Sequence, residues 1–138
     1  MTVQVNEISA ISSLIFAEDI TAGDIASYTS ISACGLTTND AYEAPQDGCI
    51  RGLGVTIKTA PSGSYVLTFA VYVNSSVTTA TTTITGSATT AYAAFDNKTV
   101  LVNAGDAIQC YVKEDNSSAT APDNILVYVL YQMGASNI

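Results

Sequence analysis

An acid, a cysteine and a base stand close together in the segment DGCIR, residues 47 to 51. A cysteine is nucleophilic as its thiolate, which a histidine, a neighbouring cation or a helix N-terminus stabilises. Arg51 is a cation close to Cys49, but the chain contains no histidine, and no helical period follows the segment. An unreactive, buried thiol is therefore the competing interpretation.

The residues around Cys49 favour that second interpretation. Pro45 to Gly48 is typical of a turn. In the strand that follows, Cys49 shares its period-2 face with Arg51 and then with three apolar residues, Leu53, Val55 and Ile57. We expect Cys49 to be the first core residue of this strand and Arg51 to lie near the polar edge of the same face.

Other catalytic and metal-binding arrangements have little support. Without histidine, the chain has no Ser-His-Asp or Cys-His set and no histidine zinc site. Most of its 12 acidic residues fall in turn positions, where aspartate caps the local backbone. We therefore expect no enzyme, no cofactor and no metal site. The alternative is calcium held by the oxygen donors of Glu114, Asp115 and Asp123, although their spacing matches no EF-hand.

Composition excludes several classes of partner. The formal net charge is −8, from 12 acids against 4 bases, and the four bases are scattered. Nucleic acids and anionic membrane surfaces are bound by clustered lysine and arginine, so we expect neither as a partner. No apolar run approaches the roughly 20 residues that a membrane helix needs.

The residue composition favours β-strands along the whole sequence, because Thr, Val, Ile and Tyr dominate and no amphipathic helical period is sustained. Short strands with period-2 alternation recur, separated by turn signals. They are expected at residues 8–16, 28–33, 49–58, 65–73, 77–85, 91–95, 99–102, 107–113 and 125–133. The sequence thus predicts an all-β fold, an antiparallel β-sandwich or jelly roll of about eight to ten strands. We expect one domain over residues 1–138, with residues 1–6 as a possible N-terminal arm.

Two of these strands are apolar on both faces. In the segment 125–133, Leu126, Tyr128 and Leu130 lie on one face, and the residues between them form a second apolar face. The segment 65–73 is likewise apolar on both faces. A strand of a monomeric sandwich normally has one polar face, so a second subunit is the expected cover. Tyrosine and methionine are enriched in interface cores. The residues predicted for a subunit interface are Tyr65, Tyr72, Tyr128, Tyr131 and Met133.

Three segments resemble a known family. They are APQDGCIRGLGVTI, TFAVYVNSS and VLVNAGDAIQCYV, and together they are similar to the C1q/TNF-like jelly roll in its bacterial and phage versions. In that family a turn ending in glycine, here Gly48, leads into a core strand, and a Gly-Asp pair, here Gly105 and Asp106, leads into another. Cys49, Ile50 and Leu53 stand where the animal members have aromatic residues.

The resemblance implies a compact homotrimer. In phages such domains resemble head-decoration (cement) proteins and fibre tips. The expected function is therefore a structural virion protein, which binds the outside of a phage head as a trimer and stabilises it. Its expected partners are itself and the major capsid protein or another virion protein, and its expected location is the capsid exterior. The alternative is a receptor- or carbohydrate-binding tip domain of a viral fibre or bacterial surface protein.

Overall fold

The computed structural model describes residues 11–18, 29–31, 33, 41–59, 66–85, 88–96, 98–114 and 123–134. Within these residues the chain forms ten strands and no helix, so none is long and apolar enough to cross a membrane. The strands are β1 (Ile11–Glu18), β2 (Thr29–Ile31), β3 (Tyr42–Glu43), β4 (Gly48–Thr59), β5 (Val66–Val73), β6 (Ser76–Thr85), β7 (Thr90–Ala94), β8 (Leu101–Val102), β9 (Ala107–Glu114) and β10 (Asp123–Met133).

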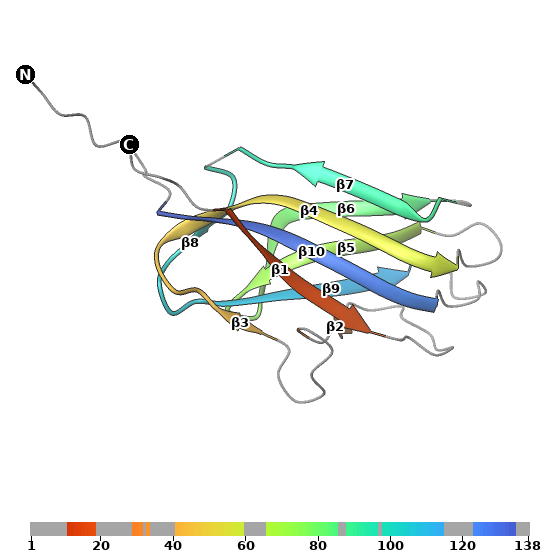
Figure 1. Cartoon of the computed structure of the whole chain (residues 1–138), viewed down its shortest axis with the longest axis horizontal. Helices are drawn as coiled ribbons and strands as arrows, with labels where there is room; N and C mark the ends of the chain where they lie inside the picture. Colours follow the sequence, from red (N-terminus) through yellow and green to blue (C-terminus); the bar gives the residue numbers. More distant parts are fainter. Residues whose placement is uncertain are drawn as a thin grey trace, which may run out of the picture.

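The strands form two antiparallel sheets packed face to face (Figure 1). The first sheet has the order β1-β10-β4-β7, with β8 also paired to β4. The second has the order β2-β9-β5-β6, with β3 also paired to β9. The chain crosses repeatedly between the sheets, and its first strand pairs with its last, as in a jelly roll. The predicted fold class, an all-β antiparallel sandwich, is confirmed.

The core lies between the two sheets and is built from alternate residues of each long strand. In β4 these are Leu53, Val55 and Ile57, and in β5 they are Leu67, Phe69 and Val71, all buried. Each such side chain contributes roughly 1.5–3 kcal/mol when it leaves water. Aromatic bulk comes from Phe16, Phe69 and Tyr131. Burial of this kind explains why period-2 alternation located the strands.

Strand positions from the sequence agree closely with the structure. Each of the nine expected segments overlaps an observed strand, and most ends differ by a few residues at most. The exception is β3, which is two residues long and is defined by its pairing with β9. A strand so short carries no alternation, and the sequence predicts no strand at residues 42–43.

Candidate functional site

The strand that contains the DGCIR segment changes phase at a β-bulge. Along β10, Leu130 pairs with Gly52 while the next residue, Tyr131, pairs with Ile50, so Arg51 has no partner of its own. Ile50 therefore joins the core face of β4, and Cys49 instead pairs with Gln132 outside the main core cluster. The prediction that Cys49 is buried is confirmed, but the prediction that it shares the core face of Leu53 is wrong. The bulge is the reason.

The surroundings of Cys49 do not activate its thiol. Burial raises the pKa of Cys49, and the nearby Asp96 carboxylate raises it further, while Arg51 acts in the opposite direction. The Arg51 guanidinium is directed elsewhere: Nε donates to the carbonyl of Phe95 at 2.9 Å, and Nη1 donates to Oε1 of Gln132 at 2.7 Å. The thiol lies 3.9 Å from that same Oε1. A thiol with a raised pKa stays protonated at neutral pH, which argues against a nucleophile.

The five residues predicted for a subunit interface do not share one surface. Tyr131 is a core residue with 1% of its side chain exposed, and its hydroxyl donates to the carbonyl of Gln46. Tyr131 is thus unavailable to a second subunit, and placing it in an interface was wrong. Met133 packs against the same core cluster. Tyr72 and Tyr128 face outward from different sheets, and Tyr65 lies outside the described residues.

Tyr128 belongs to a continuous apolar surface that we call the apolar face. It is the outer side of the first sheet, where β1, β10, β4 and β7 lie side by side. Its most exposed members come from three strands: Ile11 is 58% exposed, Tyr92 is 53% exposed and Leu126 is 44% exposed. By strand register, the other apolar residues on this side are Ile15, Ala17, Tyr128, Leu130 and Ala94, and the exposed hydroxyl residues Ser13, Thr56 and Thr90 lie among them.

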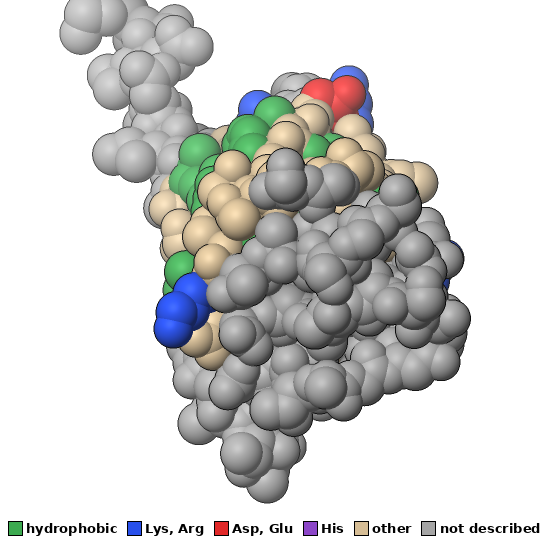
Figure 2. Space-filling view, turned by 90° about the vertical axis from the view of Figure 1, so that its right-hand side faces the viewer, with side chains coloured by type: hydrophobic (Ala, Val, Ile, Leu, Met, Phe, Trp, Pro, Cys, Tyr) green, Lys and Arg blue, Asp and Glu red, His purple; other side chains and the backbone are tan. Residues whose placement is uncertain are grey.

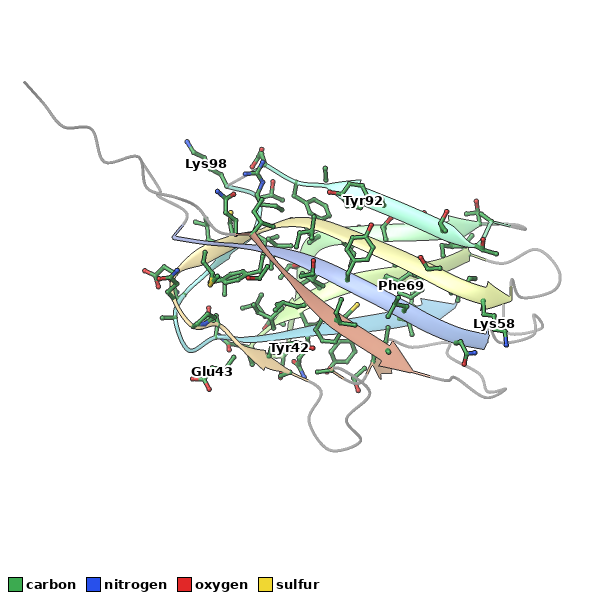
Figure 3. The ribbon with its side chains drawn as sticks, viewed as in Figure 1. Tyr42, Glu43, Lys58, Phe69, Tyr92 and Lys98 are labelled. Carbon is green, nitrogen blue, oxygen red and sulfur yellow. The ribbon has the colours of Figure 1, made fainter. Side chains whose placement is uncertain are left out.

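Two tyrosines lie flat at the centre of the apolar face. Gly54 of β4 pairs with Tyr128 on one side and with Tyr92 on the other. A Cβ at Gly54 would collide with the Tyr128 ring, so the absence of a side chain lets that ring cover the strand. The two rings are nearly parallel, with centroids 6.3 Å apart and planes 23° apart. Figure 3 shows Tyr92 on β7 at this surface. The result is a flat aromatic platform flanked by aliphatic side chains.

Charge is confined to the two ends of the apolar face. Among the described outward residues of these four strands, Arg51 lies near one end and Lys58 at the other, and those between them are uncharged. Figure 3 shows Lys58 at one end of the sandwich and Lys98 at the opposite end. Viewed from the Lys58 end, hydrophobic side chains gather at the upper left of the described surface (Figure 2). An uncharged, apolar centre with a polar rim is typical of a protein interface.

The outer side of the second sheet is different. Along β6, Thr81, Thr83 and Thr85 are exposed, and the neighbouring strands add Thr68, Gln109 and Lys113. Tyr72 and Tyr111 stack on each other there at 3.9 Å, which uses one face of each ring. This surface is rich in hydroxyl groups, although it also carries Val77, which is 56% exposed. The two sides of the sandwich therefore differ in chemistry, and the apolar face is the candidate functional surface.

The edges of the sheets are poor candidates for assembly by strand pairing. Beside β1, the hydroxyl of Tyr42 donates to the carbonyl of Ile15 at 2.7 Å, and Phe16 bridges to Ala33. In β6 the register shifts where Thr78 donates its hydroxyl to the carbonyl of Val71. Strand β7 has only five residues. Capped groups, bulges and short strands are the usual protection against edge-to-edge pairing, which leaves a face as the route to assembly.

The turns at one end of the sandwich are held by two aspartates and one asparagine. Asp106 accepts hydrogen bonds from the amide of Asn103 and from the side chain of Asn74, each at 2.9 Å. Asn74, at a φ of 51°, also accepts one from the amide of Ala107. Asp47 accepts one from the amide of Ala104 at 2.8 Å. These hydrogen bonds tie three turns together, so the aspartates at this end of the sandwich have a structural role.

Stability is expected to fall in acid through these carboxylates. Hydrogen bonds from the Asn103 amide and the Asn74 side chain lower the pKa of Asp106, and those from Lys98 and Thr99 lower the pKa of Asp96. A lowered folded-state pKa gives stabilisation that is complete above the ordinary value, about 3.9, and is lost as pH falls through the folded value. Urea unfolding between pH 5 and pH 2 should therefore show a shallower decline for Asp106→Asn than for the unchanged protein. If the free energy of unfolding fell equally steeply with pH in both proteins, this role of Asp106 would be contradicted.

The candidate calcium ligands are only partly described. Glu114 ends β9 in the second sheet and Asp123 begins β10 in the first, while Asp115 lies outside the described residues. Within the described part of the chain, no group of three or more Cys, Asp or Glu side chains is placed to hold a metal ion. Calcium at these three residues stays a prediction.

The residues that sequence analysis missed come from neighbouring strands. Tyr92, Ile11 and Ile15 reach the apolar face because β7 pairs with β4 and β1 pairs with β10. The alternation of Leu126, Tyr128 and Leu130 was the one local signal, since it marked a second apolar side on β10. No protein-family model matches the sequence, and no curated protein is significantly similar to it.

Proposed function

We propose that this chain is a structural protein that assembles into a homotrimer through the apolar face, and that the trimer decorates the outside of a viral capsid. The observation that carries the assembly is the apolar face itself. Exposed Ile11, Tyr92 and Leu126 lie on one sheet, whereas the opposite sheet is richer in threonine and carries one strongly exposed aliphatic residue, Val77. Contiguous exposed apolar surface of this kind marks an interaction site.

The size of the apolar face is suited to a small interface. Four strands about 4.8 Å apart and roughly 27 Å long span about 500 Å² in projection. A standard interface takes roughly 800 Å² of accessible surface from each partner. Side-chain relief and the adjoining turns add to the projected value, so the sheet face supplies the larger part of the required area. Further copies of the chain are the best-matched cover, because their surfaces would be equally flat and uncharged, and in a trimer each subunit would divide this face between its two neighbours.

The place on a capsid rests on the resemblance of the DGCIR, NSS and NAGD segments to phage jelly rolls. Assembly through the first sheet would leave the hydroxyl-rich second sheet facing outward, as a particle surface requires. The mechanism would be multivalent attachment, in which several linked subunits contact the major capsid protein together and so hold the shell more firmly than one subunit does.

Leu126→Asp is expected to convert the assembly into monomers. Leu126 is 44% exposed in the single chain, so an aspartate there remains solvated and folding should be almost unaffected. In the assembly the same carboxylate would be buried against apolar groups, which is far more costly. Sedimentation velocity at tens of micromolar should give a trimer for the unchanged protein and a folded monomer for the variant.

Thr83→Asp is the matched control, because Thr83 is exposed on the outer side of the second sheet. It should stay trimeric. If the unchanged protein sediments as a monomer, the proposed assembly is wrong. Immunogold labelling of virus particles that carry the chain tests the location separately, since label away from the capsid exterior would exclude decoration.

One observation favours a second candidate function. Flat aromatic platforms such as Tyr92 and Tyr128 are suited to stacking on sugar rings, and a monomer would present this platform to a carbohydrate. The aliphatic flanks, Leu126 and Ile11, fit a protein partner better than a sugar. A monomeric protein that binds a glycan array, and loses binding on Tyr92→Ala, would establish the carbohydrate alternative.

A further inference from the structure

Arg51 is an unusual residue at the end of the apolar face. It is the only arginine in the sequence, and it is half-buried at the bulge in β4. Its Nε and Nη1 groups are held by the carbonyl of Phe95 and the amide oxygen of Gln132. Its remaining N–H groups make no hydrogen bond, and no carboxylate lies within ion-pair distance of it, in the part of the chain that the structure describes. A half-buried guanidinium in this state has unused capacity for a carboxylate.

A carboxylate is held close by without pairing to it. Asp96 follows Phe95, whose carbonyl Arg51 contacts, and its Oδ1 accepts hydrogen bonds from the Lys98 amide at 2.8 Å and the Thr99 hydroxyl at 2.9 Å. Among the described residues the carboxylate is held by Lys98 and Thr99, and the Asp96 side chain is exposed, so it can accept a further hydrogen bond. Arg51 contacts the carbonyl of the residue directly before Asp96, and it makes a small contribution to lowering the pKa of Asp96 beside the hydrogen bonds from Lys98 and Thr99. Each is fixed by its own bonds, so neither turns to the other.

We infer that Arg51 of one subunit binds Asp96 of the next, and that this ion pair sets the register of the assembly. Each subunit carries the Arg51 cation beside the Asp96 anion at one corner. When subunits are related by rotation about a symmetry axis, the cation of one subunit can meet the anion of the next. Around a symmetry axis, positive and negative groups then alternate, and like charges do not meet. The pairing rests on the proposed assembly, because it needs a second copy at the apolar face.

The other charges near this corner do not serve the same role as well. Lys98 is exposed, and Figure 3 shows it directed away from the sandwich. A fully exposed lysine pair contributes little, whereas a half-buried guanidinium loses more when its partner is removed. Lys98→Gln is therefore the matched control, since it removes a positive charge from the same corner without touching the inferred pair.

The test compares assembly and coupling. Arg51→Gln and Asp96→Asn should each raise the protein concentration of half-assembly about tenfold or more, whereas Lys98→Gln should change it less than about twofold. A double-mutant cycle between positions 51 and 96 should show coupling in the assembled protein. In the monomeric Leu126→Asp background, the same cycle followed by urea unfolding should show only the weak coupling of two nearby charges that share no hydrogen bond, well below the coupling in the assembly.

The outcomes separate this inference from the proposed function. If the unchanged protein is a trimer and the Arg51 and Asp96 variants behave like Lys98→Gln, the ion pair is wrong and the assembly stands. If coupling in the monomeric background is as strong as in the assembly, the pair lies within one chain and the inference is also wrong. If the unchanged protein is a monomer, both are wrong.

Discussion

Replacing Phe69 with alanine is expected to lower the free energy of unfolding by about 3–5 kcal/mol. Phe69 is fully buried in the middle of β5, with Val112 and Thr82 beside it on the neighbouring strands. Its removal takes an aromatic ring out of the interior and leaves a cavity that the two sheets cannot close, because the strands on both sides of β5 hold it in register. Urea unfolding followed by far-UV circular dichroism, at one fixed protein concentration, measures the loss.

The comparison for Phe69→Ala is Leu101→Ala. Leu101 is 51% exposed, so its truncation should cost less than about 0.5 kcal/mol. Both variants are unfolded at the same protein concentration, because self-association of the chain would add to its apparent stability. Equal effects of the two substitutions would mean that the sandwich interior is not where Phe69 lies.

Gly48→Ala should be far more damaging than Gly54→Ala, although both glycines lie in β4. A Cβ at position 48 would collide with the backbone carbonyl oxygen of Gln132 and crowd the hydroxyl of Tyr131. That carbonyl belongs to paired β10 and has nowhere to move, so we expect a loss of about 3 kcal/mol, the upper part of the range for overpacking.

A Cβ at position 54 meets only the far end of the Tyr128 ring, which can swing out toward water. Gly54→Ala should therefore cost less than about 1 kcal/mol in unfolding free energy, since alanine also restricts the unfolded chain. It should nevertheless weaken assembly, because the displaced ring spoils the flat apolar face. Urea unfolding and sedimentation velocity separate the two effects. A Gly48→Ala protein as stable as Gly54→Ala would show that β4 and β10 are not packed as described.

Much of the fold could be predicted because β alternation is local. Leu53, Val55 and Ile57 mark their own strand in the sequence. The turns around Asn74 and Gly105 mark the ends of other strands. Histidine content and charge are also properties of the sequence alone. By contrast, β3 could not be predicted, because Tyr42 and Glu43 are a strand only by virtue of β9.

The candidate site was predicted less well. Tyr128 and Tyr131 were both assigned to a subunit interface, but Tyr128 lies on the outer side of β10 whereas Tyr131 is buried in the core. Both sides of β10 are apolar, so alternation separates Tyr128 from Tyr131 without telling which one faces the second sheet. The phase of Cys49 was wrong for a related reason: the bulge at Arg51 arises from pairing with β10, and no local pattern announces it.

The sequence by itself determined an all-β chain, the places of its main strands, the lack of any histidine chemistry and an excess of apolar surface on β10. Those properties depend on residue types and on spacing along one strand. Only the tertiary structure decided which side chains from different strands lie together on one surface. Ile11, Tyr92 and Leu126 are far apart in the sequence, and they form one apolar face because β1, β10, β4 and β7 pair in that order. Pairing order depends on contacts between distant segments, which is why the apolar face emerged only with the fold.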